Sequence, residues 1–230
     1  MLEWLQKAES IVREAGAIAA REFKHPRILR EKPYADVVTQ GDELVEAHVA
    51  AALEREFPGH GLISEESGGH HPEAESVWIL DPIDGSKYYA RGVPIYSISL
   101  ALRRRGDLVL GVVYSPETDQ MFSAAAGSGA RLNGEPIRGS RVQSLAEAFL
   151  CLEIPSRQNA EDIRRAALEK LPRLVDAVQR VRILGVSALG LCYCASGGFD
   201  AYASFSSRSQ LWDLAPLRWP WLSRPGNANS

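Results

Sequence analysis

The sequence predicts a layered α/β fold in which helices pack against β-sheets in two successive halves. Near the N-terminus, apolar residues recur at the three-and-four spacing of amphipathic helices, at residues 2–24 and 39–57. Short apolar or alternating runs are then typical of strands, at residues 61–63, 77–80, 94–102, 108–114 and 120–124. Strands and helices alternate again later in the chain, which indicates stacked layers. We therefore expect an N-terminal half, residues 1–144, and a C-terminal half, residues 145–230.

The two N-terminal helices differ in what their residues predict. The helix at residues 2–24 carries one continuous apolar stripe, which indicates packing rather than function. The next helix begins with Thr39 and with Asp42 three residues later, an acidic variant of the capping box. One role of Asp42 is therefore to satisfy the free amides of the first turn. The segment before it, with Lys32 and Asp36 around Pro33, is predicted to be irregular.

Turn residues separate the strands of the first half. Pro82 is expected to end the strand at residues 77–80, because proline cannot donate a hydrogen bond to a β-ladder. The basic run at residues 103–105 is typical of a solvated hairpin tip. Asn133-Gly134 is typical of a tight hairpin turn.

Strands and helices also alternate in the second half. Strands are predicted at residues 149–152, 180–184 and 199–205. A helix at residues 160–170 is expected to stop at Pro172, with a short continuation at residues 174–178. Another helix opens at residues 185–191, and we expect its first amides to be able to hold a phosphate or a substrate hydroxyl.

Composition indicates a soluble globular protein. The 230 residues are 45% hydrophobic, which is enough for a sizeable core. The formal charge is −3 with acids and bases well mixed, which argues against nucleic acid or membrane as a partner. No run approaches the roughly 18 apolar residues of a membrane span. The N-terminus lacks the features of a secretory signal, so we expect the protein in the cytoplasm.

Cysteine and histidine usage does not point to a redox or zinc site. Cys151, Cys192 and Cys194 are an odd number without metal-finger spacing, and we expect reduced thiols. His70 and His71 lie in a polar, glycine-bearing loop. Such histidines are more often exposed than metal ligands.

The most informative stretch is Asp81-Pro82-Ile83-Asp84-Gly85-Ser86. It follows an apolar strand, and Asp81 and Asp84 are three residues apart across a turn whose Gly85 permits a close backbone approach. Both carboxylates and the Ile83 carbonyl can then converge on a hard divalent cation, above all Mg²⁺. Taken alone, the same stretch is also compatible with an ordinary loop.

Two further acidic motifs accompany this stretch. Glu65-Glu66 follows the apolar run at residues 61–63, and Trp212-Asp213 lies far downstream. In this order the three motifs resemble the inositol monophosphatase family of Mg²⁺-dependent, lithium-sensitive phosphatases. Residues 36–42 resemble a further family motif, with Lys32 before it. The resemblance implies an α-β-α-β-α sandwich of the sugar-phosphatase type, with the active site between its halves.

The resemblance also implies roles for individual residues. It implies two or three Mg²⁺ ions, held by Glu65, Asp81, the Ile83 carbonyl, Asp84 and Asp213. Asp42 and Ser86, where relatives usually have threonine, would orient and deprotonate the attacking water, and Glu66 is grouped with these catalytic residues. The residues assigned to the substrate are Gly85, Ser86, Gly185, Val186, Ser187 and Asp213.

Two departures from the family pattern affect these expectations. The stretch at residues 206–210 lacks the acid that contacts the sugar-like ring in inositol-specific members, so a related small phosphorylated metabolite becomes a credible substrate. Only seventeen residues follow Asp213. We therefore expect the family's last elements to be missing, the tail to be disordered, and a homodimer partner to cover exposed apolar edges.

Two functions from different classes follow. The first is Mg²⁺-dependent hydrolysis of a small phosphomonoester. The second is a shortened, non-catalytic homologue that acts as a metal-binding or subunit-interaction module.

Overall fold

The computed structural model describes residues 1–32, 36–157 and 159–205. The helices are α1 (Leu2–Phe23), α2 (Gln40–Glu56), α3 (Ser86–Tyr89), α4 (Glu161–Ala177) and α5 (Ser187–Ala195), with 3₁₀ turns η1 (Pro116–Thr118) and η2 (Leu145–Glu147). The strands are β1 (Ile28–Lys32), β2 (Asp36–Thr39), β3 (Gly61–Ser64), β4 (Ser76–Asp84), β5 (Ser97–Arg104), β6 (Asp107–Ser115), β7 (Gln120–Ala125), β8 (Gly129–Leu132), β9 (Glu135–Pro136), β10 (Phe149–Glu153), β11 (Arg180–Arg182) and β12 (Ala201–Ser204).

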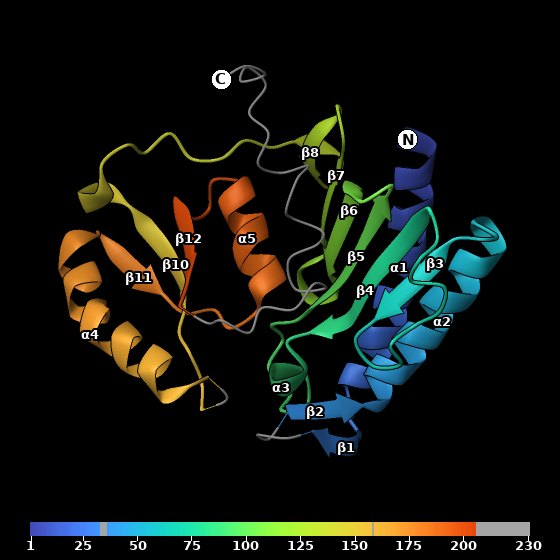
Figure 1. The fold of residues 1–230 in the computed structure, drawn as a ribbon, viewed down its shortest axis with the longest axis horizontal. Helices are drawn as coiled ribbons and strands as arrows, with labels where there is room; N and C mark the ends of the chain where they lie inside the picture. Colours follow the sequence, from blue (N-terminus) through green and yellow to red (C-terminus); the bar gives the residue numbers. More distant parts are fainter. Residues whose placement is uncertain (33–35, 158, 206–230) are drawn as a thin grey trace.

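The elements stack in α-β-α-β-α order, which confirms the predicted layered α/β fold. From right to left, Figure 1 shows α1 with α2, the larger sheet, α5, the smaller sheet and α4. The larger sheet has seven strands in the order β3-β4-β5-β6-β7-β8-β9. β3 pairs with β4 in parallel, and the other neighbours are antiparallel.

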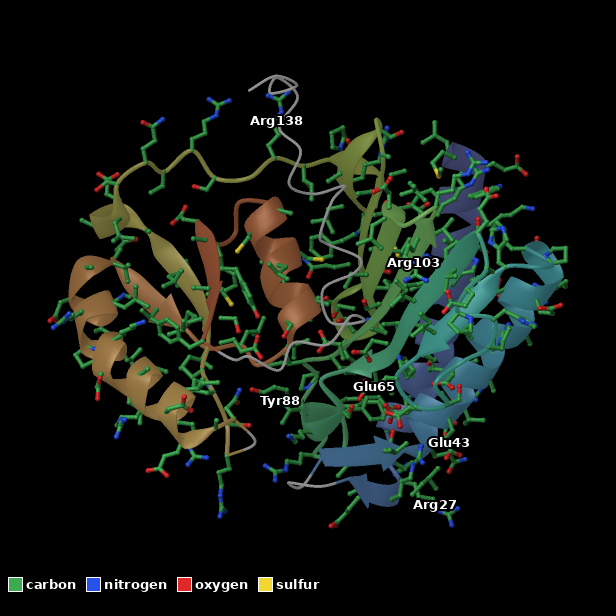
Figure 2. The ribbon with its side chains drawn as sticks, in the orientation of Figure 1. Arg27, Glu43, Glu65, Tyr88, Arg103 and Arg138 are labelled. Carbon is green, nitrogen blue, oxygen red and sulfur yellow. The ribbon has the colours of Figure 1, made fainter. Side chains whose placement is uncertain are left out.

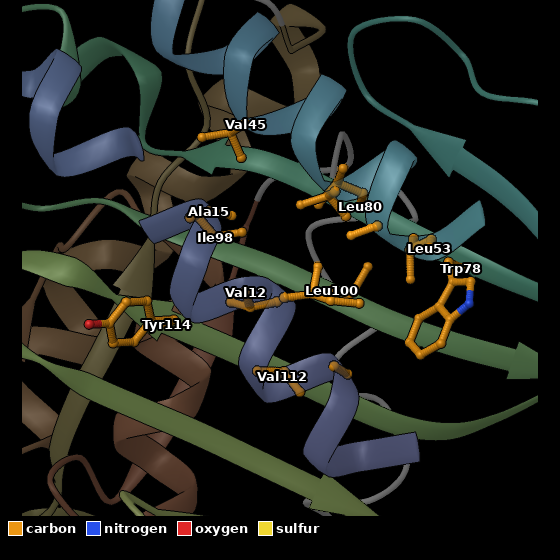
Figure 3. Packing of buried hydrophobic residues seen from close by; sticks show 14 of the residues in the cluster. Val12, Ala15, Val45, Leu53, Trp78, Leu80, Ile98, Leu100, Val112 and Tyr114 are labelled. Atoms are coloured by element: carbon orange, nitrogen blue, oxygen red, sulfur yellow. The ribbon is translucent and has the colours of Figure 1, made fainter. Parts of the chain in front are cut away.

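The main hydrophobic core lies between the larger sheet and the two N-terminal helices. Figure 3 shows Val12 and Ala15 of α1 beside Ile98 and Leu100 of the sheet, and all four are fully buried. Burial of one such aliphatic side chain larger than alanine stabilises the fold by about 1.5–3 kcal/mol. The apolar stripe predicted at residues 2–24 therefore does pack against the sheet.

Strand β4 continues past Pro82, which corrects the prediction that the strand ends there. The strand runs to Asp84, and its pairing with β5 shifts register between Asp81 and Asp84. A β-bulge leaves an unpaired position, and proline is tolerated there because no ladder hydrogen bond is required of it. The bulge bends the strand at the point where the two acids occur.

The segment predicted to be irregular before α2 forms a β-hairpin instead. β1 and β2 are antiparallel, with Lys32 opposite Asp36 in the backbone register. The turn between them lies outside the described residues. β2 leads directly into α2, because its last residue, Thr39, is the N-cap of that helix.

The smaller sheet has the order β11-β10-β12, and all its pairs are parallel. α4 extends through Pro172, although the sequence predicted a stop there. Pro172 removes one helical hydrogen bond, whose acceptor would be the carbonyl of Leu168. Because the Leu168 side chain is 66% exposed, this part of α4 faces water, which can solvate the carbonyl.

The predicted turns and thiols agree with the structure. Asn133 and Gly134 both have positive φ and join β8 to β9 in an antiparallel pair. Arg105 and Gly106 form the tip between β5 and β6. Free thiols occur at Cys151 and Cys192, which are buried, and at Cys194, which is half-buried. Within the described ranges, no helix combines the length and apolar composition that crossing a membrane requires.

Candidate active site

One cavity lies between the end of β4 with α3 on one side and Gly185, which precedes α5, on the other. Its volume is about 440 Å³, within the range of small-molecule sites. Figure 2 shows Glu65 and Tyr88 in the region between the larger sheet and the second half. The lining residues are Glu65, Asp81, Ile83, Asp84, Gly85, Ser86, Lys87, Tyr88, Arg91 and Gly185.

The bulged end of β4 supplies two carboxylates to this cavity. Asp81 is 2% exposed, and Asp84 follows after the register shift. The backbone N–H of Ala188 donates to Asp84 Oδ2 over 2.9 Å. This hydrogen bond joins the larger sheet to the start of α5. The Ala188 amide is one of the first amides of the helix that the sequence analysis expected to hold a phosphate or a substrate hydroxyl.

Glu65 and Glu66 leave β3 beside β4, as the parallel pairing requires. The N–H of Glu65 donates to the Leu80 carbonyl over 3.3 Å, which holds the turn against β4. Glu65 lines the cavity, whereas Glu66 is paired with Arg30 of β1 at 3.2 Å. The Glu66 side chain is only 4% exposed. This contact gives Glu66 a structural role beside the catalytic one that was predicted for it.

Asp42 forms the predicted capping box with Thr39. The Thr39 N–H donates to Asp42 Oδ2 over 2.8 Å, and the Thr39 hydroxyl donates to the same oxygen over 2.5 Å. Asp42 is 1% exposed. Its pKa is raised to about 7, chiefly because burial disfavours the charged carboxylate; the Thr39 hydrogen bonds oppose this rise, and the nearby Glu66 and Glu65 charges contribute to it.

Glu46 was missed at the sequence level. It lies one helical turn after Asp42 on α2 and is 8% exposed. Its Oε2 accepts from the Ser64 hydroxyl, and from the Glu66 N–H over 3.3 Å. Glu46 thus fixes the end of β3 and the turn that carries the acidic pair. An acid among the apolar residues on the inner face of a helix was the available signal.

Gly85 and Ser86 form the turn after β4. Gly85 has φ +101°, and a Cβ there would lie 2.9 Å from the Ile95 carbonyl oxygen, so this position requires glycine. The Ser86 hydroxyl donates to the Ile83 carbonyl over 3.0 Å. Both residues line the cavity. The Ser86 oxygen can still accept a hydrogen bond from water, and the Ile83 oxygen has a second lone pair.

The residues predicted to bind substrate in the second half occupy different positions in the structure. Gly185 lines the cavity, but Val186 and Ser187 do not. Val186 is 1% exposed and packs in an apolar cluster. The Ser187 hydroxyl donates to Glu153 Oε2 over 3.2 Å. Asp213 lies outside the described residues.

The oxygen donors of the cavity suit a hard divalent cation. Glu65, Asp81, Asp84 and the Ile83 carbonyl border one space, and none is a soft ligand. In the part of the chain that the structure describes, no three acidic, histidine or cysteine side chains lie close enough to hold a metal by themselves. A divalent cation in this cavity would therefore need further ligands, such as water or a bound ligand, beside these residues.

Comparison with known proteins decides the family. The model of the inositol monophosphatase family matches residues 1–218. The chain belongs to the inositol monophosphatase family. It is 33% identical to Nus factor SuhB of Pseudomonas aeruginosa over 220 residues, covering 94% of this chain and 80% of that protein. It is 32% identical to human inositol monophosphatase 2 over 219 residues, covering 93% and 75%.

Solved structures of inositol monophosphatase relatives share the fold. The native crystal structure of extragenic suppressor protein SuhB from Bartonella henselae has a TM-score of 0.86 at 28% identity, over 93% of this chain and 82% of that one. The inositol monophosphatase of Thermotoga maritima has a TM-score of 0.81 at 28% identity, over 93% and 80%.

This member of the inositol monophosphatase family also has cationic cavity residues that sequence reasoning missed. Lys87 and Arg91 line the cavity together with Tyr88. They directly follow the Asp-Gly-Ser turn in the sequence, and that position was the available signal.

Proposed function

We propose that the protein hydrolyses a small phosphomonoester in a Mg²⁺-dependent reaction. The observation that carries this proposal is the shared cavity of Glu65, Asp81, Asp84 and the Ile83 carbonyl beside Gly85 and Ser86. Family membership supports phosphatase chemistry. Metal dependence and the roles of these residues are part of the proposal.

In the reaction, a water oxygen forms a bond to phosphorus while the bond from phosphorus to the ester oxygen breaks. One water proton ends on the departing alcohol, and inorganic phosphate is the other product. When bound, Mg²⁺ neutralises charge on the phosphate and makes water a better nucleophile. Glu65, Asp81, Asp84 and the Ile83 carbonyl would hold it.

Asp42 and Ser86 are the protein residues that activate the attacking water. The Ser86 hydroxyl donates to the Ile83 carbonyl, so its oxygen can accept from a water and orient it. The raised pKa of Asp42, about 7, suits a group that gains a proton near neutral pH. The start of α2 lies close to this turn, as the distance from a Cβ on Gly41 to Ile83 Cδ1 shows, which would be 3.0 Å.

Phosphate release with and without Mg²⁺ tests the proposal, using wild-type protein and Asp84→Asn. Asparagine keeps an oxygen acceptor for the Ala188 N–H but removes a charge from the ligand set. Because ligand and metal stabilise transition-state charge by several kcal/mol, we expect a loss of more than about 100-fold in kcat. Asp107→Asn, at an exposed hairpin position, is the matched control. Unchanged turnover in Asp84→Asn contradicts the assignment of Asp84.

A second candidate is a binding role without catalysis, alone or as a homodimer. The relative from Pseudomonas aeruginosa is named a Nus factor, which supports a role besides phosphate release. Folded protein that binds Mn²⁺ in calorimetry but hydrolyses no ester would favour this candidate. Turnover with Mg²⁺ favours the enzyme.

A further inference from the structure

Tyr89 is a buried residue at the end of the short helix that begins with Ser86. It is fully buried, and the cavity is lined by its neighbour Tyr88 rather than by Tyr89 itself. The backbone N–H of Tyr89 donates to the Gly85 carbonyl over 3.0 Å. Tyr89 is therefore fixed to the Asp-Gly-Ser turn without touching a ligand in the cavity.

The Tyr89 side chain joins this turn to helix α1. Its hydroxyl donates to the Ala19 carbonyl over 2.7 Å. Burial raises the pKa of the Tyr89 phenol, and the nearby Asp42 charge adds to the rise, so the phenol keeps the proton that this hydrogen bond needs. The Tyr89 ring also packs against Phe23 of α1, with 5.4 Å between the ring centroids.

The same hydroxyl lies against the start of α2, next to Asp42. A Cβ on Gly41 would lie 2.5 Å from Tyr89 Oη and 2.9 Å from Tyr89 Cζ, which is closer than real Cβ atoms come to their neighbours. Gly41 is not among the residues with positive φ, so its backbone alone would accept another residue. The tyrosine is what requires glycine here, and its hydroxyl fills the space that a side chain at this position would need.

We infer that Tyr89 is a positioning residue, which sets the distance between Asp42 and Ser86. This inference rests on the proposed function, in which these two residues activate the attacking water. The backbone of Tyr89 is bound to the turn that carries Ser86, and its hydroxyl lies against Gly41, which directly precedes Asp42. Because neither Tyr89 nor Gly41 lines the cavity, changes at either position should act on kcat rather than on KM.

A double-mutant cycle of Gly41→Ala and Tyr89→Phe tests the inference by phosphate release with Mg²⁺, from inositol 1-phosphate or p-nitrophenyl phosphate. To reach ordinary contact, Gly41→Ala must displace the start of α2 by about 1 Å, and a displacement of this size costs up to about 100-fold in kcat. Tyr89→Phe loses one hydrogen bond and leaves a gap, so kcat should fall by about threefold to tenfold.

The double variant gives the decisive result. Its added methyl group occupies the space of the lost hydroxyl, so kcat should exceed that of both single variants, and that of Gly41→Ala by about tenfold. Losses that simply add in the double variant overturn the inference while the phosphatase function stands. Should Gly41→Ala fail to fold, a double variant with kcat no higher than that of Tyr89→Phe overturns it equally.

Tyr96→Phe is the matched control for the lost hydroxyl. Tyr96 is also fully buried, and its ring centroid lies 4.8 Å from that of Tyr89. Its hydroxyl donates to Glu117 Oε1 over 2.9 Å instead. The two variants therefore lose the same group from the same core, but Tyr96→Phe should keep the kcat of wild-type protein. Equal kcat for the two variants, each measured where circular dichroism shows it to be folded, overturns the inference.

Failure of the proposed function would look different, because wild-type protein would release no phosphate from either ester. Amide hydrogen exchange then judges the positioning independently of turnover. Exchange in the first turn of α2, residues 41–44, should accelerate about tenfold in Tyr89→Phe and slow again in the double variant. Tyr96→Phe should leave these amides unchanged. Equal exchange there in the two phenylalanine variants overturns the inference.

Discussion

At the residue scale, Asp42 combines a structural and a chemical property in one carboxylate. Its Oδ2 accepts both Thr39 hydrogen bonds and completes the cap of α2. Its burial disfavours the charged form, because water cannot solvate the carboxylate there. The same residue therefore stabilises the helix start and takes up a proton more readily than an exposed aspartate.

This raised pKa makes the stability of the metal-free protein depend on pH. The folded-state pKa of about 7 exceeds the ordinary value of 3.8. Between these values the folded protein holds a proton that the unfolded chain has lost, so stability decreases as pH rises, by up to about 1.4 kcal/mol per pH unit. Asp42→Asn keeps an acceptor for both Thr39 donors, and it removes the contribution of Asp42 to the pH dependence of stability.

We expect the stability difference between Asp42→Asn and wild-type protein to increase from pH 5 to pH 7 in favour of the variant. Urea unfolding at each pH, with a chelator present, measures it. Glu43→Gln, an exposed position on the same helix turn, is the control. Stability curves of the Asp42 variant and wild type that run parallel over this range would refute the assignment.

Glu46 gives a second prediction at the residue scale. Glu46→Ala leaves the buried Ser64 hydroxyl and the Glu66 N–H without this acceptor, which costs about 1–3 kcal/mol of stability. Because the turn also carries Glu65, the Mg²⁺ concentration for half-maximal activity should rise. Glu46→Gln keeps an acceptor oxygen, and its effect should be smaller. A purely structural role predicts lower stability in Glu46→Ala with unchanged Mg²⁺ dependence in the remaining folded protein.

At the element scale, α1 lies close to the larger sheet because Gly16 has no side chain. A Cβ at Gly16 would lie 2.4 Å from Tyr114 Cε1. The Tyr114 ring is held in place, since its hydroxyl donates to Asp119 Oδ1 over 2.9 Å and the Arg13 guanidinium lies 5.0 Å from its centroid. The helix can approach the sheet only if this position stays small.

Gly16→Ala should therefore destabilise the protein although alanine favours helices. Overpacking costs about 1–3 kcal/mol, and the gain in helix propensity is at most about 1 kcal/mol. The midpoint of urea unfolding measures the balance. Ala17→Gly, at the exposed neighbouring position, is the control and should cost about 1 kcal/mol through propensity alone. A Gly16→Ala variant as stable as wild type would show that Tyr114 can move.

Local sequence was sufficient for most elements but not for the effect of two prolines. The Thr39 cap and the Asn133-Gly134 turn involve neighbouring residues, so their patterns predicted them correctly. Pro82 and Pro172 were expected to end a strand and a helix. Pro82 is tolerated because the pairing of β4 with β5 has a bulge there, and Pro172 because the freed helix carbonyl faces water. Both conditions depend on how the element is placed in the folded protein, which the local sequence does not reveal.

The same distinction applies to the site at the scale of the whole molecule. The motif order predicted residues that line one cavity, including Glu65, Asp81 and Asp84. It did not predict that Ala188 would cap Asp84, or that Glu46 would hold the acidic turn. Those contacts join residues 104 and 18 positions apart, and spacing along the chain carries no information about them.

The two halves are stabilised unequally, and α5 couples them. The larger sheet is covered by α1 and α2 over an extensive core, whereas α4 buries only Ala167. The smaller sheet therefore depends on α5, which packs Leu189 and Cys192 against Val113 and Phe122 of the larger sheet. Regions with few buried apolar contacts open at lower free energy than the global unfolding.

Leu189→Ala should consequently loosen the second half before the first. Leu189 is 3% exposed, and truncation of a buried leucine costs about 2–5 kcal/mol. Amide hydrogen exchange should accelerate in β10 while β4 keeps its protection. Leu100→Ala, in the core of the larger sheet, should accelerate exchange in both strands, because β4 pairs directly with β5. Equal acceleration in β4 and β10 for Leu189→Ala would mean that the halves unfold as one cooperative unit, so that Asp84 and Gly185 could not separate without global unfolding.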